Sequence, residues 1–163
     1  MIISTAKQDV YELFDLLQIP YKVYDHPPIF SQADNEKHRL DIGAVIFKNL
    51  FLQNASKSNY YLYSLPISKR ADLISLRALL SESRLSFGDA DMLFDKLNIK
   101  PGSVSFLNII KKPTTDVFFL IDKEIFDSEF FGVHPNDNTS TIVFKPSQIS
   151  TILDHFHAKY RFI

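Results

Sequence analysis

The sequence predicts an α+β fold in which a mixed, mostly antiparallel and barrel-like β-sheet has helices packed around it. The chain has 163 residues, of which 45% are hydrophobic, and this is enough to bury one sizeable core. Segments with strand periodicity and segments with helical periodicity follow one another without strict alternation, which favours α+β over α/β. No repeat, low-complexity tract or linker divides the chain, so we expect residues 1–163 to form a single domain.

The N-terminal segment is expected to form one helix and then one strand. Thr5 can cap a helix over residues 6–18, where apolar side chains recur at helical spacing until Pro20 stops it. The segment YKVYDH (21–26) alternates like a strand. Pro27-Pro28 then forces a turn.

The following segment predicts a second helix and a hairpin. Ser31 and Asp34 resemble a weak capping box, which would begin a helix that ends near Arg39. The apolar segments AVIFKNLFLQN (44–54) and YYLYSLP (60–66) have the composition of strands. Because only the polar turn ASKSN separates them, we expect the two strands to pair.

The second half of the chain predicts three helices and four further strands. Two short helices are expected over residues 72–80 and 89–97, and Pro101-Gly102 closes the second. Pro146 suits the first turn of a final helix that reaches about His157. The strand candidates are SVSFLNII (103–110), DVFFLID (116–122), FFGV (130–133) and STIVF (140–144).

Charge and composition argue against several classes of protein. The chain has 18 Lys+Arg against 19 Asp+Glu, a formal net charge of -1, which does not fit a polybasic nucleic-acid binder. Its four glycines cannot be arranged as a P-loop or a GxGxxG turn. The absence of cysteine rules out disulfides, thiolate metal ligands and a cysteine nucleophile. Nothing argues for an oxidising compartment, so we expect a cytoplasmic protein.

The sequence also predicts a protein without a membrane partner. No stretch approaches the roughly 20 apolar residues that a membrane-spanning helix needs. The N-terminal segment carries Lys7, Asp9, Glu12 and Asp15, so it is interpreted as folded structure rather than a signal peptide. A monomer suits the size of the chain.

Lys48 interrupts the apolar run AVIFKNLFL (44–52) and is the first candidate for a functional residue. On an extended strand its side chain would share a face with Ile46 and Leu50, where lysine is uncommon. The lysine could lie at a strand edge with its ammonium in water, or anchor an anion or a carbonyl oxygen at the floor of a cleft. Asn49 would point to the opposite face, so both could serve one site only if a bulge or backbone groups intervene.

The segment GVHPNDN (132–138) places an imidazole at the end of an apolar strand. His134 could line a cleft there, or the segment could be an ordinary turn held by Asn136 or Asn138. His26 could line a pocket or mark the turn at Pro27.

Metal chemistry and serine nucleophiles are not indicated. His155 and His157 would lie on different faces of a helix, and no third ligand has the spacing for zinc. The sequence has no GxSxG elbow. We therefore expect no metal and no cofactor.

The chain as a whole resembles the YbaK / prolyl-tRNA synthetase-associated editing domain family, over about residues 6–155. Its length and N-terminal helix are similar to those of the stand-alone members that deacylate alanyl-tRNA(Pro), often called PrdX or ProXp-ala proteins. Seven segments carry the resemblance in order: VYDHPPIFS (23–31), KNLFL (48–52), YYLYSLP (60–66), RLSFGDADML (84–93), KPGSVS (100–105), VFFLIDKEIF (117–126) and GVHPNDNTST (132–141).

The resemblance implies a YbaK-like fold and a trans-editing activity. Prolyl-tRNA synthetase attaches smaller amino acids to tRNA(Pro), and a second, size-limited pocket that admits alanine but excludes proline removes them by ester hydrolysis. The implied partners are the acceptor end of tRNA(Pro) and, by docking, prolyl-tRNA synthetase. Two alternatives stay open: the same fold could edit serine or cysteine, or it could bind aminoacyl-tRNA or a synthetase without turnover.

The resemblance also assigns site residues. The catalytic group is expected to be Lys48, Asn49 and His134, in which Lys48 holds the tRNA end and the ester, and His134 shapes the pocket or bonds the substrate amine or a backbone group. The expected substrate-binding residues are His26, Phe30, Phe47, Ser105, Gly132, Pro135 and Asn138.

Two segments depart from the pattern of the family. Where relatives commonly have PGSVTPFGL, this chain has PGSVSFLNI, so that Ser105 to Asn108 replace Thr-Pro-Phe-Gly. Where relatives tend to have an HPLTN-like turn, this chain has Asn136, Asp137 and Asn138 after His134-Pro135. The size of the pocket, and hence the amino acid removed, depends on these segments.

Overall fold

The structure is a computed structural model, and it describes residues 5–29, 31, 33–34, 37, 42–113 and 116–163. The helices and 3-10 turns are α1 (Thr5–Leu16), α3 (Leu73–Leu79), α4 (Ala90–Leu97), η1 (Phe106–Ile110), η2 (Lys123–Asp127) and α5 (Gln148–His155). The strands are β1 (Lys22–Asp25), β2 (Val45–Asn54), β3 (Tyr60–Pro66), β4 (Leu85–Phe87), β5 (Val117–Ile121), β6 (Phe131–Val133), β7 (Ser140–Phe144) and β8 (Lys159–Phe162).

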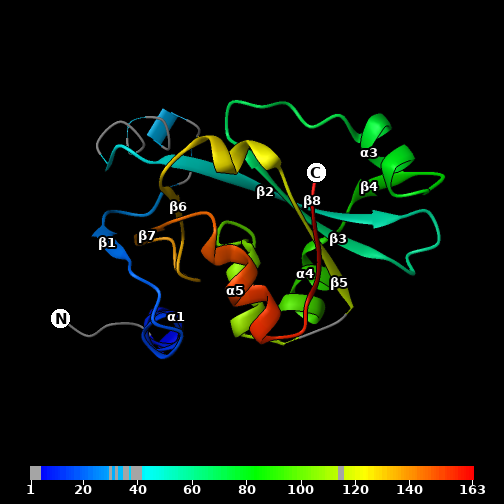
Figure 1. Ribbon diagram of the computed structural model, residues 1–163. Helices are drawn as coiled ribbons and strands as arrows, with labels where there is room; N and C mark the ends of the chain where they lie inside the picture. The colour runs from blue at the N-terminus through cyan, green and yellow to red at the C-terminus, as the bar shows by residue number, and fades with distance from the viewer. Residues whose placement is uncertain (1–4, 30, 32, 35–36, 38–41, 114–115) are drawn as a thin grey trace.

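The strands form one mixed sheet in the order β1-β7-β6-β2-β3-β5-β8, with β4 paired to β2 outside this path. Four of the seven pairings are antiparallel, among them the expected β2–β3 hairpin, and three are parallel. Figure 1 shows the long strand β2 crossing the molecule, with β1, β6 and β7 near one end and β3, β4 and β5 toward the other. The predicted α+β class and mixed sheet are confirmed. The sheet is open, with β1 and β8 at its ends.

Two apolar clusters hold the helices on the sheet. The larger one joins the inner faces of α1, α4, η1 and α5 to side chains such as Phe119, Phe131 and Phe144, all of them fully buried. The smaller one packs α3 on the other face, where Leu76 meets Leu52. Burial of each such Leu or Phe side chain contributes about 1.5–3 kcal/mol, which fixes the register of the strands that border the site.

The helix ends follow from local hydrogen bonds. Asp72 and Asp89 lie just before α3 and α4, and their carboxylates accept from the backbone N–H groups of Ser75 (3.0 Å) and Met92 (2.8 Å). The two predicted short helices are therefore confirmed to within a residue. The helix expected to begin at Ser31 falls largely outside the described residues. No helix of the described segments is long and apolar enough to span a bilayer.

The strand predicted over residues 103–110 is wrong. These residues form the turn of η1, because Ser105 Oγ accepts from Leu107 N (3.1 Å) while Asn108 Oδ1 accepts from Ser105 N (2.8 Å). This reciprocal capping box satisfies the backbone locally and competes with a sheet ladder. The apolar run misled because Phe106 to Ile109 are buried all around, so they show no helical stripe.

Candidate active site

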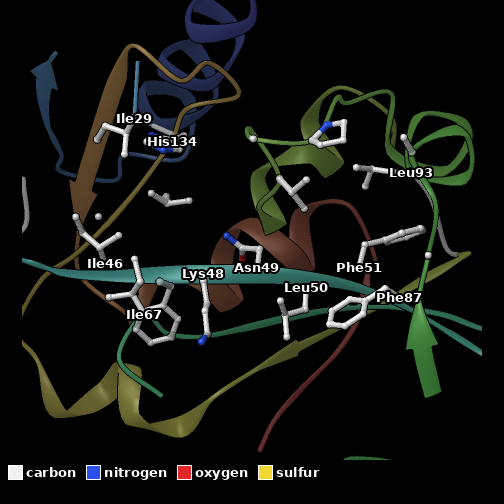
Figure 2. Close-up of a pocket in the computed structure, with 18 of the residues that line it drawn as sticks. Ile29, Ile46, Lys48, Asn49, Leu50, Phe51, Ile67, Phe87, Leu93 and His134 are labelled. Atoms are coloured by element: carbon white, nitrogen blue, oxygen red, sulfur yellow. The ribbon is translucent and has the colours of Figure 1, made fainter. Parts of the chain in front are cut away.

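A pocket of about 440 Å³ opens along β2, between β6 at one end and β4 at the other. Figure 2 shows β2 running through the site with labelled side chains on both sides of the strand. Its lining comes from five segments: Ile46–Phe51 of β2, Phe87–Ala90 at the end of β4 and after it, Pro101–Gly102 with Val104, Gly132–His134 at the end of β6 and after it, and Thr141 of β7; Ile29, Ile67 and Leu93 complete it.

The pocket lies at a gap in the sheet. On the edge opposite β3, β6 is in register with β2 only as far as Ile46, and β4 begins at Leu52. In the described part of the chain, no strand is in register with residues 47–51 on that edge. The strand edge therefore faces the pocket instead of a neighbour.

The hydrogen bonds of β2 show which backbone groups face this gap. Ile46 O accepts from Ile67 N (3.1 Å) and Asn54 N donates to Asn59 O (3.1 Å), so the even-numbered residues of β2 direct their backbone groups to β3. The odd-numbered residues direct theirs to the other edge, in agreement with the 2.9 Å bond from Gly88 N to Phe51 O. The N–H and C=O of Asn49 consequently face the gap.

Lys48 and Asn49 lie on opposite faces of β2, as the alternation of a strand predicts. Lys48 is opposite Leu65, and Asn49 is opposite Ser64, whose Oγ donates to Asn49 Oδ1 at 2.6 Å. In Figure 2 the two side chains leave β2 in opposite directions. Both are half-buried and both line the pocket, because the open strand edge lies between them. Backbone groups of the edge, rather than a bulge, thus bring both faces to one site.

His134 is held in one tautomer by the strand beside it. Its Nδ1 lies 3.0 Å from the carbonyl oxygen of Ser140, and a carbonyl can only accept, so Nδ1 carries the proton and Nε2 is the acceptor. Burial lowers the pKa of His134 below its usual 6.5, and the Ser140 carbonyl opposes this effect only in part. The imidazole is therefore mostly neutral at pH 7, and Nε2 is its acceptor.

His26 and Asn138 stand behind the lining and hold it. His26 Nε2 lies 2.9 Å from Thr141 Oγ1, and its Nδ1 lies 2.8 Å from the Pro27 carbonyl oxygen. Asn138 brackets Ile29: its Oδ1 accepts from Ile29 N (3.1 Å) and its Nδ2 donates to Ile29 O (2.8 Å). Since Thr141 and Ile29 line the pocket, both predicted residues contact it through one intermediate.

The structure brings most of the predicted site residues together. Lys48, Asn49, Phe47, Gly132 and His134 line the pocket directly. Ser105 is fully buried next to the lining residue Val104, and Pro135 is buried next to His134. Phe30 lies outside the described residues.

Sequence analysis missed the buried pairing of Asn136, in the His134 segment, with Asn108. Asn108 Nδ2 donates to Asn136 Oδ1 (2.7 Å) and to Ser103 O (3.1 Å), and Asn136 Nδ2 donates to Leu107 O (3.1 Å). Asn136 has φ +59°, and its N–H donates to His134 O at 2.9 Å. The one signal in the sequence was that both asparagines lie in segments that depart from the pattern of the family. The two departures were noted separately, and nothing in the sequence indicated that the two side chains are in contact.

Sequence analysis also missed the rim of the pocket at β4, which is formed by Phe87 and Gly88. Phe87 lines the pocket although it is 62% exposed, and Gly88 beside it approaches β2 closely. A Cβ on Gly88 would lie 2.4 Å from the ring of Phe51, so only glycine fits there. Strand β4 has three residues, too few for a periodic signal.

The site offers complementary groups around one opening. Lys48 supplies an ammonium, Asn49 supplies a side-chain amide and an edge N–H, and His134 supplies an uncharged acceptor. Such a set can hold an anion or a polarised carbonyl on one side and an ammonium on the other. Within the described segments, no three His, Asp or Glu side chains are grouped so that they could hold a metal ion.

Comparison with known proteins gives consistent results. The family model described as "Aminoacyl-tRNA editing domain" matches residues 26–152. The "Prolyl-tRNA editing protein ProX" of Acetoanaerobium sticklandii is 31% identical over 148 residues, 91% of this chain and 90% of that protein. The "Prolyl-tRNA synthetase associated domain-containing protein 1" of Xenopus laevis is 25% identical over 151 residues, 90% of this chain and 89% of that protein.

Solved structures share the fold. The crystal structure of a candidate trans-editing enzyme for prolyl tRNA synthetase superposes with a TM-score of 0.70 at 15% identity, covering 99% of this chain and 98% of that one. A hypothetical protein superposes with a TM-score of 0.71 at 13% identity, covering 93% and 96%. At such identities the likeness concerns the architecture alone.

Proposed function

The chain belongs to the aminoacyl-tRNA editing domain family, as its motifs predicted, and from this premise we propose that it is a trans-editing hydrolase of mischarged tRNA(Pro). The ester that it cleaves joins the amino acid, alanine in the first place, to the terminal ribose. The observation that carries the proposal is the gap beside β2, where Lys48, Asn49 and His134 line one pocket. The proposed partners are the acceptor end of tRNA(Pro) and, by docking, prolyl-tRNA synthetase, and we expect a cytoplasmic monomer.

Hydrolysis of this ester depends more on the positioning of water and the carbonyl group than on a strong base. A water molecule attacks the ester carbonyl carbon, the carbonyl oxygen becomes negative, and the ribose hydroxyl leaves with a proton. Lys48 and the edge N–H of Asn49 are donors that can meet the developing negative charge. The neutral Nε2 of His134 can accept a hydrogen bond from the ammonium of the amino acid. This fixes the carbonyl relative to the donors.

Selection of the amino acid would come from the size of the pocket. A site that accepts proline cannot exclude alanine by binding alone, because a smaller side chain fits wherever a larger one does. A second, smaller site with fixed walls can admit alanine and exclude proline. The wall that carries His134 is fixed from below by Asn136 and Asn108, which suits a site that measures size.

The test is single-turnover hydrolysis of tRNA(Pro) charged with alanine, serine, cysteine or proline, at fixed salt, by the wild type and by Lys48→Ala. We expect the wild type to remove alanine, to leave proline, and to lose about a hundredfold or more in rate on loss of the donor at Lys48. The matched control is Lys57→Asn, which removes an exposed lysine from the β2–β3 turn and keeps a residue that tolerates its φ of +56°.

The remaining outcomes discriminate the alternatives. Preferential loss of serine or cysteine would keep the reaction and change the substrate. Binding of aminoacyl-tRNA without hydrolysis of any of the four would replace the hydrolase with a binding module. Wild-type rates in Lys48→Ala would remove the proposed role of this lysine.

A further inference from the structure

Phe87 is an exposed aromatic ring at the mouth of the pocket. It lines the opening and leaves 62% of its surface in water, whereas Phe51, two positions from Asn49 on β2, is 7% exposed. Several large hydrophobic side chains of the described residues are exposed, and among them Phe87 is the one that lines the pocket, outside both core clusters.

The register of β4 places this ring on the Lys48 face of β2. Phe87 is directly opposite Leu52, and residues opposite each other in a strand pair project to the same face. Leu52 shares that face with Leu50 and Lys48 by the alternation of the strand. Figure 2 shows Leu50 and Lys48 directed to one side of β2, and Asn49 to the other.

The backbone that carries the ring is held by hydrogen bonds on both sides. Strand β4 pairs with β2 up to Phe87, and Gly88 N then donates to Phe51 O at 2.9 Å. Gly88 packs against the Phe51 ring with no room for a Cβ. Asp89 next begins α4 by accepting from Met92 N. The backbone position of Phe87 is thus fixed, so binding need not order this segment of the chain.

We propose that Phe87 is the stacking platform for the adenine of the nucleotide that carries the amino acid at the 3′ end of tRNA. This inference rests on the proposed function and adds a base-binding subsite to it. The unpaired 3′ end of an RNA presents free base faces, and stacking on an aromatic ring suits such an end. The apolar side chain of Leu50 borders the same surface.

The charge on this face suits a nucleotide, because Lys48 shares the face of the Phe87 ring. Lys48 lies four residues from Leu52 along β2, about 13 Å at the rise of a strand. A nucleotide whose base stacks on Phe87 can extend along β2 toward the Lys48 ammonium, which can meet its 5′ phosphate as well as the ester. The ester, attached to that sugar, would then reach the open edge at Asn49, and the amino acid would enter beside His134.

The test couples Phe87 to the terminal adenosine itself. Binding of two uncharged tRNA(Pro) molecules, one complete and one lacking only the terminal adenosine, is measured for the wild type, Phe87→Ala, Phe87→Tyr and Phe94→Ala. Phe94 is the matched control, because it is 54% exposed on α4 and is not among the lining residues. We expect the wild type to prefer the complete tRNA by about tenfold. We expect Phe87→Ala to lose this preference, and Phe87→Tyr and Phe94→Ala to keep it.

A kinetic readout separates the platform from the chemistry. With alanyl-tRNA(Pro), Phe87→Ala should raise KM and leave kcat nearly unchanged, because the stacked base is bound alike before and during hydrolysis. Alanine ethyl ester, which has no base, should be hydrolysed equally by the wild type and Phe87→Ala.

Each other result overturns the platform. An unchanged preference for the complete tRNA in Phe87→Ala, or an equal loss in Phe94→Ala, rejects it. A defect that arises only when prolyl-tRNA synthetase is present would make Phe87 a protein contact instead. Failure of the proposed function looks different: the wild type would hydrolyse no aminoacyl-tRNA and yet bind the terminal adenosine through Phe87.

Discussion

The two walls of the pocket differ in how they are built. The wall that carries His134 rests on Asn108 and Asn136, which are 0% and 5% exposed and are bonded to each other. The opposite rim at β4 carries Phe87, which contributes to neither core cluster. A buried polar network tolerates little change, because each lost partner leaves another group unsatisfied. The closed wall is thus suited to set what fits, and the open rim is suited to set how firmly the ligand is held.

Loss of Asn108 is the largest effect expected from this difference. Asn108→Ala leaves the Ser105 N–H and the Asn136 Oδ1 without their buried partner, so we expect the free energy of unfolding to fall by about 3 kcal/mol. Urea denaturation with an unchanged m value measures it. Phe87→Ala should cost less than about 1 kcal/mol.

The control for this prediction is Asn59→Ala. Asn59 also donates to a side chain, Glu82 at 2.8 Å, but in an exposed position. Asn59→Ala should lower the free energy of unfolding by about 0.5 kcal/mol. If Asn108→Ala and Phe87→Ala lowered the free energy of unfolding equally, the proposed difference between the two walls would be wrong.

The backbone of Asn136 gives an effect of intermediate size. At φ +59° alanine is strained, whereas glycine is not, and both substitutions remove the same hydrogen bonds. The free energy of unfolding of Asn136→Ala should therefore be about 1–2 kcal/mol lower than that of Asn136→Gly. If hydrolysis is measured as well, both variants should discriminate less between alanine and proline than the wild type. Retained selectivity in both would show that this wall does not set the size of the site.

The protonation of His134 gives the smallest effect. Its pKa is lowered by burial, so the unfolded chain binds the proton more readily than the folded one as the pH falls below about 6.5. Its contribution to stability is complete above this pH and is lost as the pH falls toward the folded pKa. Between pH 7 and pH 5.5, the wild type should lose more stability than His134→Gln. His155→Gln, at an exposed position, should follow the wild type.

The sequence predicted the strands whose periodicity is local and the residues whose motif is contiguous. β2, β3, β5, β6 and β7 were expected within a residue or two of their ends, because runs of apolar, aromatic and β-branched residues bounded by turn residues identify them. Lys48, Asn49 and His134 were brought together by resemblance, although Lys48 and His134 are 86 positions apart. The turn at Phe106 escaped because its cause is a pair of polar side chains inside an apolar run.

The features missed at the site depend on contacts between distant segments. Asn108 and Asn136 each resemble ordinary turn residues until the fold buries them together. Phe87 became a site residue only because three residues of β4 pair with the end of β2. The role of the β2 edge could not be predicted either, since it depends on where β6 stops and β4 begins.

The gap in the sheet also bears on self-association. An unpaired strand edge is the usual template for edge-to-edge aggregation, and proteins protect such edges with charge or by covering them. Here the open stretch spans only Phe47–Phe51, is closed at both ends by β6 and β4, and carries the charged residue Lys48. A foreign strand therefore cannot extend along it, whereas a small group can still reach it. The gap offers backbone donors and acceptors to a substrate without offering them to another sheet.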